Sequence, residues 1–121
     1  EISYIHAEGY PAGEMKHGVN ALLGSKMPTI LIIPDDELFE KNLGTINEVK
    51  ARGSKTLVIT DSNSKDLRTL SDDLIVVPKI NNLLSPILFI IALQIIAYHT
   101  AISLNLDPDK PRNLAKTVTV E

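Results

Sequence analysis

The chain has 121 residues, of which 44% are hydrophobic and 22% are charged, and this composition is typical of one small globular domain. The net charge is −3, and the lack of a basic stripe argues against nucleic acid as a partner, because phosphate backbones are bound by clustered Lys and Arg. The absence of cysteine excludes disulfides and thiolate metal sites, and it is consistent with a reducing cytoplasm.

The N-terminal segment contains the first expected elements. The sequence starts with Glu1 instead of Met and shows no signal-peptide pattern, so we expect a piece of a longer polypeptide. No capping residue precedes residues 1–6, which are interpreted as the end of a helix that starts upstream. Residues 7–10 could form a short strand, and residues 11–18 could form a brief helix with Pro11 near its first turn.

The middle of the chain alternates between strand and helix patterns. Residues 29–33 are an unbroken, mostly β-branched run between two prolines, which favours a strand covered on both faces. A helix is expected from about residue 37 to residue 52, because its apolar residues recur every three or four positions. Asp35 and Asp36 could cap this helix, and Gly53 is a natural terminator.

The same alternation continues with a second strand at residues 56–60, a short helix near residues 65–70 and a third strand at residues 74–77. Strand–helix–strand units of this length pair in parallel through right-handed crossovers. The sequence therefore predicts an α/β fold with three layers (α/β/α) around a parallel, doubly wound sheet.

The last expected element is a long helix at about residues 82–104, which is nearly all apolar from residue 83 to residue 98. A membrane-spanning helix needs roughly 20 apolar residues, and here Pro86 and Gln94 interrupt the run while no Lys or Arg flanks it closely. A helix that is apolar on all sides also suits the centre of an α/β protein. We favour this buried helix, with no membrane as a partner, over the membrane-spanning alternative. The prolines after Asp107 prevent the helix from continuing.

Two blocks of sequence resemble a known family. The block EISYIHAEGYPAGEMKHG occupies residues 1–18, and the block PRNLAKTVTVE occupies residues 111–121. Both are similar to signature segments of the isomerase half of the glutamine–fructose-6-phosphate aminotransferase family, which is built from two sugar isomerase (SIS) domains. The order and spacing of strands and helices between the blocks are similar too. The sequence departs from the family pattern at Val19-Asn20, where Pro-Leu is common.

The resemblance implies that residues 1–106 are part of the second SIS domain and that residues 107–121 form a catalytic tail. Such domains have a five-stranded parallel sheet that binds ligands at the carboxyl ends of its strands. The first strand and most of the first helix would therefore lie upstream of Glu1. The first SIS domain and a glutaminase domain would be partners outside this sequence, which agrees with its lack of a Gly-rich or Walker phosphate loop.

Lys116 carries the chemistry that the resemblance implies. The tail lysine of the family forms a Schiff base with the ketone of open-chain fructose 6-phosphate, and Ala115 and Lys116 would bind this substrate. A lysine so near the last residue is otherwise usually solvated. With a reference pKa near 10.4, deprotonation at pH 7 costs roughly 4.6 kcal/mol, so the site must lower that pKa. Arg112 could be a cation that does so, or it could only anchor the tail.

The resemblance gives two more residues a role. Glu1 matches the carboxylate that moves a proton between C1 and C2 of the sugar. His17 matches the histidine that assists ring opening from the neighbouring subunit, which implies a homodimer. Without the resemblance, both would be interpreted as exposed surface residues. His6 and His99 have no such match and are interpreted as structural. No pair of His and carboxylate has metal-ligand spacing, so we expect no metal. The resemblance implies no organic cofactor.

The implied function is the conversion of fructose 6-phosphate and glutamine-derived ammonia to glucosamine 6-phosphate in the cytoplasm, the first step of hexosamine biosynthesis, with the isolated chain inactive. A function of another class stays open, in which an SIS-type module binds sugar phosphates without catalysis and regulates a partner. The Asn-Leu-Ala-Lys block at residues 113–116 and Glu1 favour the enzyme, because a sensor has no chemical need for them.

Overall fold

The computed structural model describes residues 1–112 of the chain. The chain divides into two compact units. One unit comprises residues 9–92 and contains the sheet. Of the described residues, the other unit joins residues 1–8 to residues 93–112, so that segments far apart in the sequence belong to one body.

A three-stranded parallel sheet forms the centre of residues 9–92. β1 (Thr29–Ile32), β2 (Thr56–Thr60) and β3 (Asp73–Val76) are neighbours in that order. In the register of the sheet, Thr29 lies opposite Thr56 and Leu57 lies opposite Asp73. The predicted strand positions are confirmed to within one residue. Consecutive parallel strands joined through helices also confirm the α/β class.

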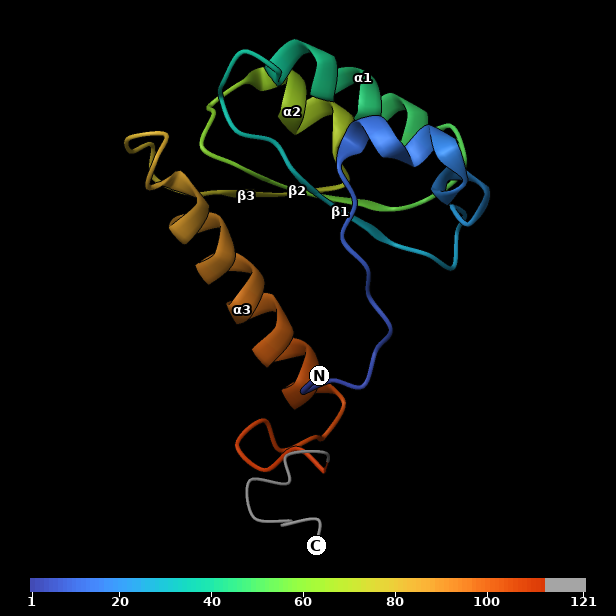
Figure 1. Ribbon diagram of the computed structural model, residues 1–121, viewed down its shortest axis with the longest axis vertical. Coiled ribbons are helices and arrows are strands. Elements are labelled where there is room, and N and C mark those ends of the chain that lie inside the picture. Colours follow the sequence, from blue (N-terminus) through green and yellow to red (C-terminus); the bar gives the residue numbers. More distant parts are fainter. Residues whose placement is uncertain (113–121) are drawn as a thin grey trace, which may run out of the picture. The chain divides into compact units, whose positions relative to one another are not determined.

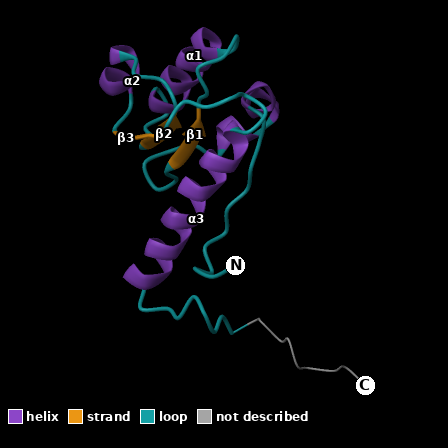
Figure 2. Cartoon of the chain, turned by 90° about the vertical axis from the view of Figure 1, so that its left-hand side faces the viewer, coloured by secondary structure: helices purple, strands orange, loops and turns teal. Residues whose placement is uncertain are grey.

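Helices α1 (Phe39–Lys50) and α2 (Lys65–Leu70) cover the same face of this sheet (Figures 1 and 2). Side chains from this face, from the two helices and from the N-terminal 3₁₀-helix form the core: Met15, Leu31, Ile33, Ile46, Val49, Val58 and Leu67. On β1, Ile30 and Ile32 alternate with the core residues and are each 43% exposed. The prediction that this strand is covered on both faces is therefore wrong for the described residues.

The N-terminal segment differs from its prediction. Residues 1–10 form neither helix nor strand, so the expected helix end and the expected short strand are both wrong. A single turn of helix without preceding turns does not recover the cost of nucleation. The brief helix expected after Pro11 is confirmed as a 3₁₀-helix, η1 (Ala12–His17), which is followed by η2 (Val19–Ala21). Gly18 separates the two with a φ of 136°, a conformation that favours glycine.

Asp72 directly precedes β3 and contacts both the start of β2 and the end of α1. Its carboxylate accepts hydrogen bonds from the backbone N and Oγ1 of Thr56, at 2.8 and 2.9 Å, and from Nζ of Lys50 at 3.2 Å. The backbone N–H of Thr56 contributes most, and together these donors lower the pKa of Asp72 from 3.8 to about 2. The carboxylate is therefore ionised at neutral pH and holds the amino end of the sheet together.

Helix α3 (Ser85–Ser103) begins three residues later and ends one residue earlier than predicted. Asn105 ends it in the left-handed conformation, with a φ of 57°, and the backbone N of Leu106 donates to the carbonyl of Ala101 at 3.0 Å, as in a Schellman cap. Asparagine tolerates this conformation better than most residues because its short polar side chain bonds locally.

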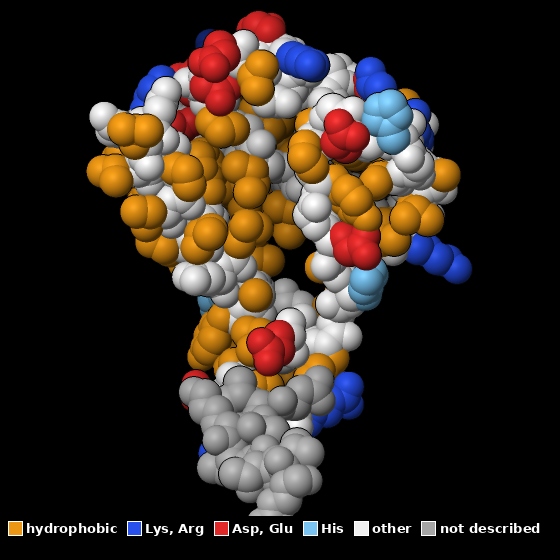
Figure 3. Space-filling model, viewed as in Figure 1, with side chains coloured by type: hydrophobic (Ala, Val, Ile, Leu, Met, Phe, Trp, Pro, Cys, Tyr) orange, Lys and Arg blue, Asp and Glu red, His pale blue; other side chains and the backbone are white. Residues whose placement is uncertain are grey.

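The expectation that this long helix is buried is wrong for the described chain. Only 22% of its most apolar window is buried, and hydrophobic side chains gather over it in Figure 3. A helix that is apolar on every side needs neighbours on every side, and residues 1–112 do not supply them. By length and composition, α3 would also suffice to cross a membrane. The exposed apolar side chains on this helix include Ile87, Ile90, Ile91, Ile95, Tyr98 and Ile102.

Candidate functional site

The carboxyl ends of the three strands bring two carboxylates and one amine together. Asp35 follows β1, Asp61 follows β2 and Lys79 follows β3. The backbone N of Asp35 donates to Oδ1 of Asp61 at 2.8 Å, and Nζ of Lys79 donates to Oδ2 of Asp35. Asp61 is buried, with 6% of its surface exposed. Doubly wound sheets bind their ligands at this edge, so the cluster lies where the fold favours a site.

The Lys79 amine in this cluster is held as a cation. Its hydrogen bond to Asp35 raises the pKa of Lys79 most, desolvation opposes the rise, and the charges of Asp35 and Asp61 add to it. An amine with a raised pKa is a poor nucleophile at neutral pH, because only its neutral form attacks a carbonyl. The cluster therefore orders three loops at the edge of the sheet and does not supply an imine-forming lysine.

Sequence reasoning missed this cluster. From the sequence, Asp35 and Asp36 could both cap the following helix. In the structure, Asp36 serves that end, because its Oδ1 accepts a hydrogen bond from the backbone N of Leu38 at 2.9 Å and its carbonyl accepts one from the backbone N of Phe39 at 3.1 Å. Asp35 instead bonds Asp61 and Lys79. One pattern in the sequence could have predicted the cluster: an acidic residue follows shortly after each of two neighbouring parallel strands, and the carboxyl ends of such strands meet at one edge of the sheet.

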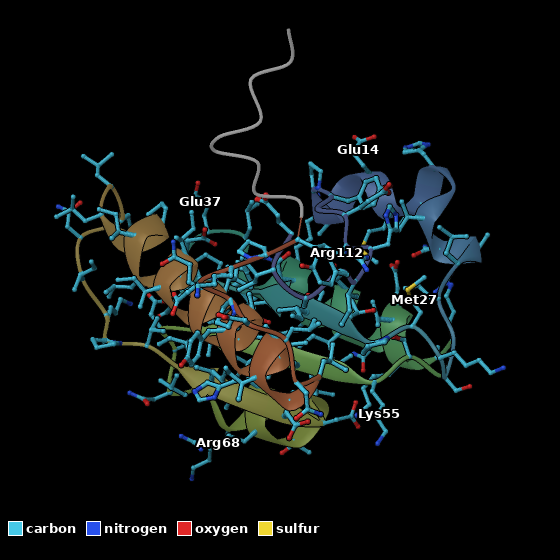
Figure 4. The ribbon with its side chains drawn as sticks, turned by 90° about the horizontal axis from the view of Figure 1, so that it is seen from below. Glu14, Met27, Glu37, Lys55, Arg68 and Arg112 are labelled. Atoms are coloured by element: carbon cyan, nitrogen blue, oxygen red, sulfur yellow. The ribbon has the colours of Figure 1, made fainter. Side chains whose placement is uncertain are left out.

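A groove of about 530 Å³ lies between η1, α1 and the end of β1. Lys16 and Glu48 both line it and form an ion pair at 3.2 Å, and Lys41 adds a second amine. None of the lining residues is buried. Glu14, on the exposed side of η1, points outward (Figure 4). The groove is open and mixed in charge, which does not define a class of ligand.

The residues predicted for catalysis are placed in different parts of the chain. Glu1 is exposed at the beginning of the unit that contains residues 1–8, and His17 is exposed at the end of η1 in the unit that contains the sheet. Ala115 and Lys116 lie outside the described residues. The convergence of Glu1, His17 and Lys116 in one active site therefore stays a prediction.

Tyr4 and Arg112 contact each other in the unit that contains both ends of the described chain. The backbone N of Arg112 donates to Oη of Tyr4 at 2.7 Å, and Cζ of Arg112 lies 3.9 Å from the centroid of the Tyr4 ring. The second distance is that of a cation–π interaction. The sequence leaves two roles open for Arg112, a cation near Lys116 or an anchor of the tail, and it predicts no role for Tyr4.

Within residues 1–112, no group of three or more His, Asp or Glu side chains is placed to hold a metal ion. The two histidines without a family match make local contacts. Nε2 of His6 lies 3.2 Å from Oε1 of Glu8, and the rings of His99 and Tyr98 meet edge to face with centroids 5.4 Å apart.

Comparison with known proteins finds relatives along the whole chain. A family model described as the SIS domain matches residues 1–104. The glutamine–fructose-6-phosphate aminotransferases (isomerizing) of Thermus thermophilus and Thermococcus kodakarensis are 49% and 50% identical to it over 121 residues, which is 100% of this chain and 20% of each relative. The chain thus spans about a fifth of the length of these curated relatives.

A solved structure gives the same result for the fold. It is described as the C-terminal domain of glucosamine-fructose-6-phosphate aminotransferase from Francisella tularensis. It superposes with a TM-score of 0.76 at 38% sequence identity, covering 88% of this chain and 30% of that one.

Proposed function

The chain belongs to the SIS domain family, and on this premise we propose that it is the C-terminal part of an enzyme that makes glucosamine 6-phosphate from fructose 6-phosphate and glutamine-derived ammonia. The observation that carries the proposal is an identity of 48–51% over all of this chain with relatives named for that aminotransferase. The aligned length includes both ends of the sequence, where Glu1 and Lys116 lie.

Lys116 is the proposed nucleophile. Its neutral amine attacks the C2 ketone of open-chain fructose 6-phosphate, water leaves, and an imine joins Nζ to C2. Ammonia then adds to C2 and displaces the lysine, which leaves a sugar imine and a free amine. The reaction needs a lowered pKa at Lys116, which burial or a nearby cation would provide.

Glu1 and His17 are proposed to move protons. The Glu1 carboxylate takes a proton from C1 and returns it to C2, so that the C2 imine becomes an amine and C1 becomes the aldehyde carbon. His17, contributed by a neighbouring copy of the chain, assists opening of the sugar ring. This sharing makes the proposed enzyme a homodimer, placed in the cytoplasm, and the chemistry requires no organic cofactor.

Residues 1–106 are proposed to be part of an SIS domain, and residues 107–121 its catalytic tail. The uncovered apolar surface of β1 and α3 supports a larger domain around them. A strand from the preceding part of a longer polypeptide would pair with the free edge of β1, and a helix from the same part would cover Ile30 and Ile32. With 43% of each side chain exposed, completing the burial would contribute on the order of 1 kcal/mol per residue.

Borohydride reduction in the presence of fructose 6-phosphate tests this function in the complete enzyme. Reduction of the imine should attach the sugar to Lys116, which peptide mass spectrometry would locate. Lys110, an exposed lysine in the same segment, is a matched control and should stay unlabelled. A label on another lysine would remove Lys116 from the mechanism. Sugar-phosphate binding without any trapped imine would favour the non-catalytic regulatory module instead.

A further inference from the structure

The turn between η1 and η2 directly follows His17, the residue proposed to assist opening of the sugar ring. Met15, two positions before His17, belongs to the core and is 7% exposed. Val19, two positions after His17, packs against the same core cluster. His17 itself is exposed. The backbone is therefore anchored on both sides of a histidine whose side chain stays accessible to a ligand.

Gly18 gives this turn a conformation that other residues rarely adopt. Its φ is 136° and its ψ is −42°, and a Cβ makes such a positive φ unfavourable. The carbonyl of Gly18 accepts a hydrogen bond from the backbone N of Ala21 at 3.0 Å, which is the first bond of η2. The chain thus leaves His17 along a path that depends on glycine at the next position.

The space around Gly18 allows its conformation to be tested separately from packing. Apart from its neighbours in the chain, no heavy atom of the described residues lies within 4 Å of the position that a Cβ at Gly18 would occupy. Gly13, within η1, has equally open surroundings and no positive φ. A methyl group added at Gly18 therefore acts through the backbone alone, and Gly13 is the matched position at which it should have no effect.

We infer that Gly18 is a positioning residue for ring opening, because its conformation, held between the anchors Met15 and Val19, sets the place from which His17 presents its imidazole. This inference rests on the proposed function. In ring opening the bond between C2 and the ring oxygen O5 breaks, the C2 hydroxyl loses its proton and O5 gains one, which leaves the C2 ketone. An imidazole transfers such protons only within hydrogen-bond reach of them, and a misplacement of about 1 Å costs roughly 100-fold in rate.

Three variants of the complete enzyme and two substrates test this role. The variants are Gly18→Ala, Gly13→Ala and His17→Ala. The substrates are fructose 6-phosphate and its 5-deoxy analogue, which lacks the hydroxyl that closes the furanose ring and therefore stays open. For each variant, kcat and KM with both substrates, glutamine hydrolysis and Tm are measured. The ratio of kcat/KM between the two substrates isolates the ring-opening step.

A positioning role predicts a loss that is confined to the cyclic substrate. Gly18→Ala should lower kcat/KM for fructose 6-phosphate by about 10- to 100-fold, while the open analogue and glutamine hydrolysis stay close to wild type. His17→Ala should show the same difference between substrates, and Gly13→Ala should match wild type with both. A fall in Tm is expected for Gly18→Ala, because alanine opposes the positive φ, but a loss of folded enzyme would affect both substrates equally.

Two results would overturn the inference and leave the proposed function intact. In one, His17→Ala loses activity only with the cyclic substrate, whereas Gly18→Ala matches wild type. In the other, Gly18→Ala loses activity equally with both substrates. If Gly18→Ala does not fold, Val19→Ala, which weakens the anchor after the turn, decides by the same ratio. A His17→Ala variant that treats both substrates alike would remove His17 from ring opening in the proposed function, and the role of Gly18 with it.

Discussion

Two isoleucines three positions apart, Ile30 and Ile33, test how the sheet is covered. Ile33 follows β1 and is 1% exposed, whereas Ile30 within β1 is 43% exposed. Ile33 belongs to the core under α1 and α2. Replacing each with alanine removes the same atoms, so the difference in stability between Ile33→Ala and Ile30→Ala reports the difference in their surroundings.

The expected magnitudes follow from burial. The change from Ile to Ala removes three carbon groups, worth about 0.8 kcal/mol each when fully buried, or about 2.4 kcal/mol in all. At Ile33 the closed core adds a cavity term, so the free energy of unfolding should fall by about 3–5 kcal/mol. At Ile30 roughly half of this transfer free energy applies, because the side chain is half exposed, and the substitution leaves no closed cavity. The free energy of unfolding should therefore fall by about 1 kcal/mol.

Urea unfolding of the 121-residue chain, followed by circular dichroism, measures both values. With a slope of about 1.5 kcal/mol per molar urea, Ile33→Ala should lower the midpoint by about 2–3 M and Ile30→Ala by less than 1 M. Equal shifts for the two variants would refute the arrangement of faces on β1. In the complete enzyme, the cost of Ile30→Ala should rise toward that of Ile33→Ala if an upstream segment covers this face.

The remaining predictions concern charge and chemistry. Because the pKa of Asp72 is lowered, its ionised carboxylate stabilises the fold at pH values above the ordinary pKa of 3.8. This stabilisation is lost as the pH falls through about 2. Wild type should therefore lose stability between pH 4 and pH 2 more steeply than Asp72→Asn, and parallel unfolding curves would count against the hydrogen bonds from Thr56. In the complete enzyme, Lys116→Arg should abolish glucosamine 6-phosphate formation and leave glutamine hydrolysis measurable, because Arg keeps the charge but does not form the imine. Glucosamine 6-phosphate made by this variant, detected by a chromatographic assay, would contradict the prediction. The isolated 121-residue chain should show no synthase activity in the same assay, and turnover by it would contradict the proposal that other domains are needed.

The sequence predicted the elements whose signals are local. The apolar run at residues 56–60 and the short helix at residues 65–70 match β2 and α2 at both ends. The strand after Pro28 was equally clear, because its prolines and β-branched residues mark it without reference to any neighbour. The predicted helix at residues 1–6 failed for a physical reason, since a single turn is unstable without preceding turns.

Contacts between distant segments were beyond reach of these signals. Asp35, Asp61 and Lys79 meet because three loops end at one edge of the sheet, and composition alone does not show which acidic residue bonds which lysine. Tyr4 and Arg112 meet across 108 positions. The candidate catalytic residues Glu1, His17 and Lys116 came from a resemblance of sequence blocks and not from any pattern of spacing, and their convergence is still to be tested.

The apolar character of β1 and α3 links the fold to the proposed function. A strand with apolar side chains on both faces and a helix without a polar face are unfavourable in water, because each exposed apolar side chain forgoes the free energy of burial. The described residues cover one face of β1 and part of α3, so the sequence is adapted to surroundings larger than itself. Curated relatives that are five times longer offer such surroundings within one polypeptide, since this chain covers 20% of them. A membrane around α3 would leave Ile30 and Ile32 exposed on the sheet. Protein cover accounts for both surfaces at once, which is why we favour it.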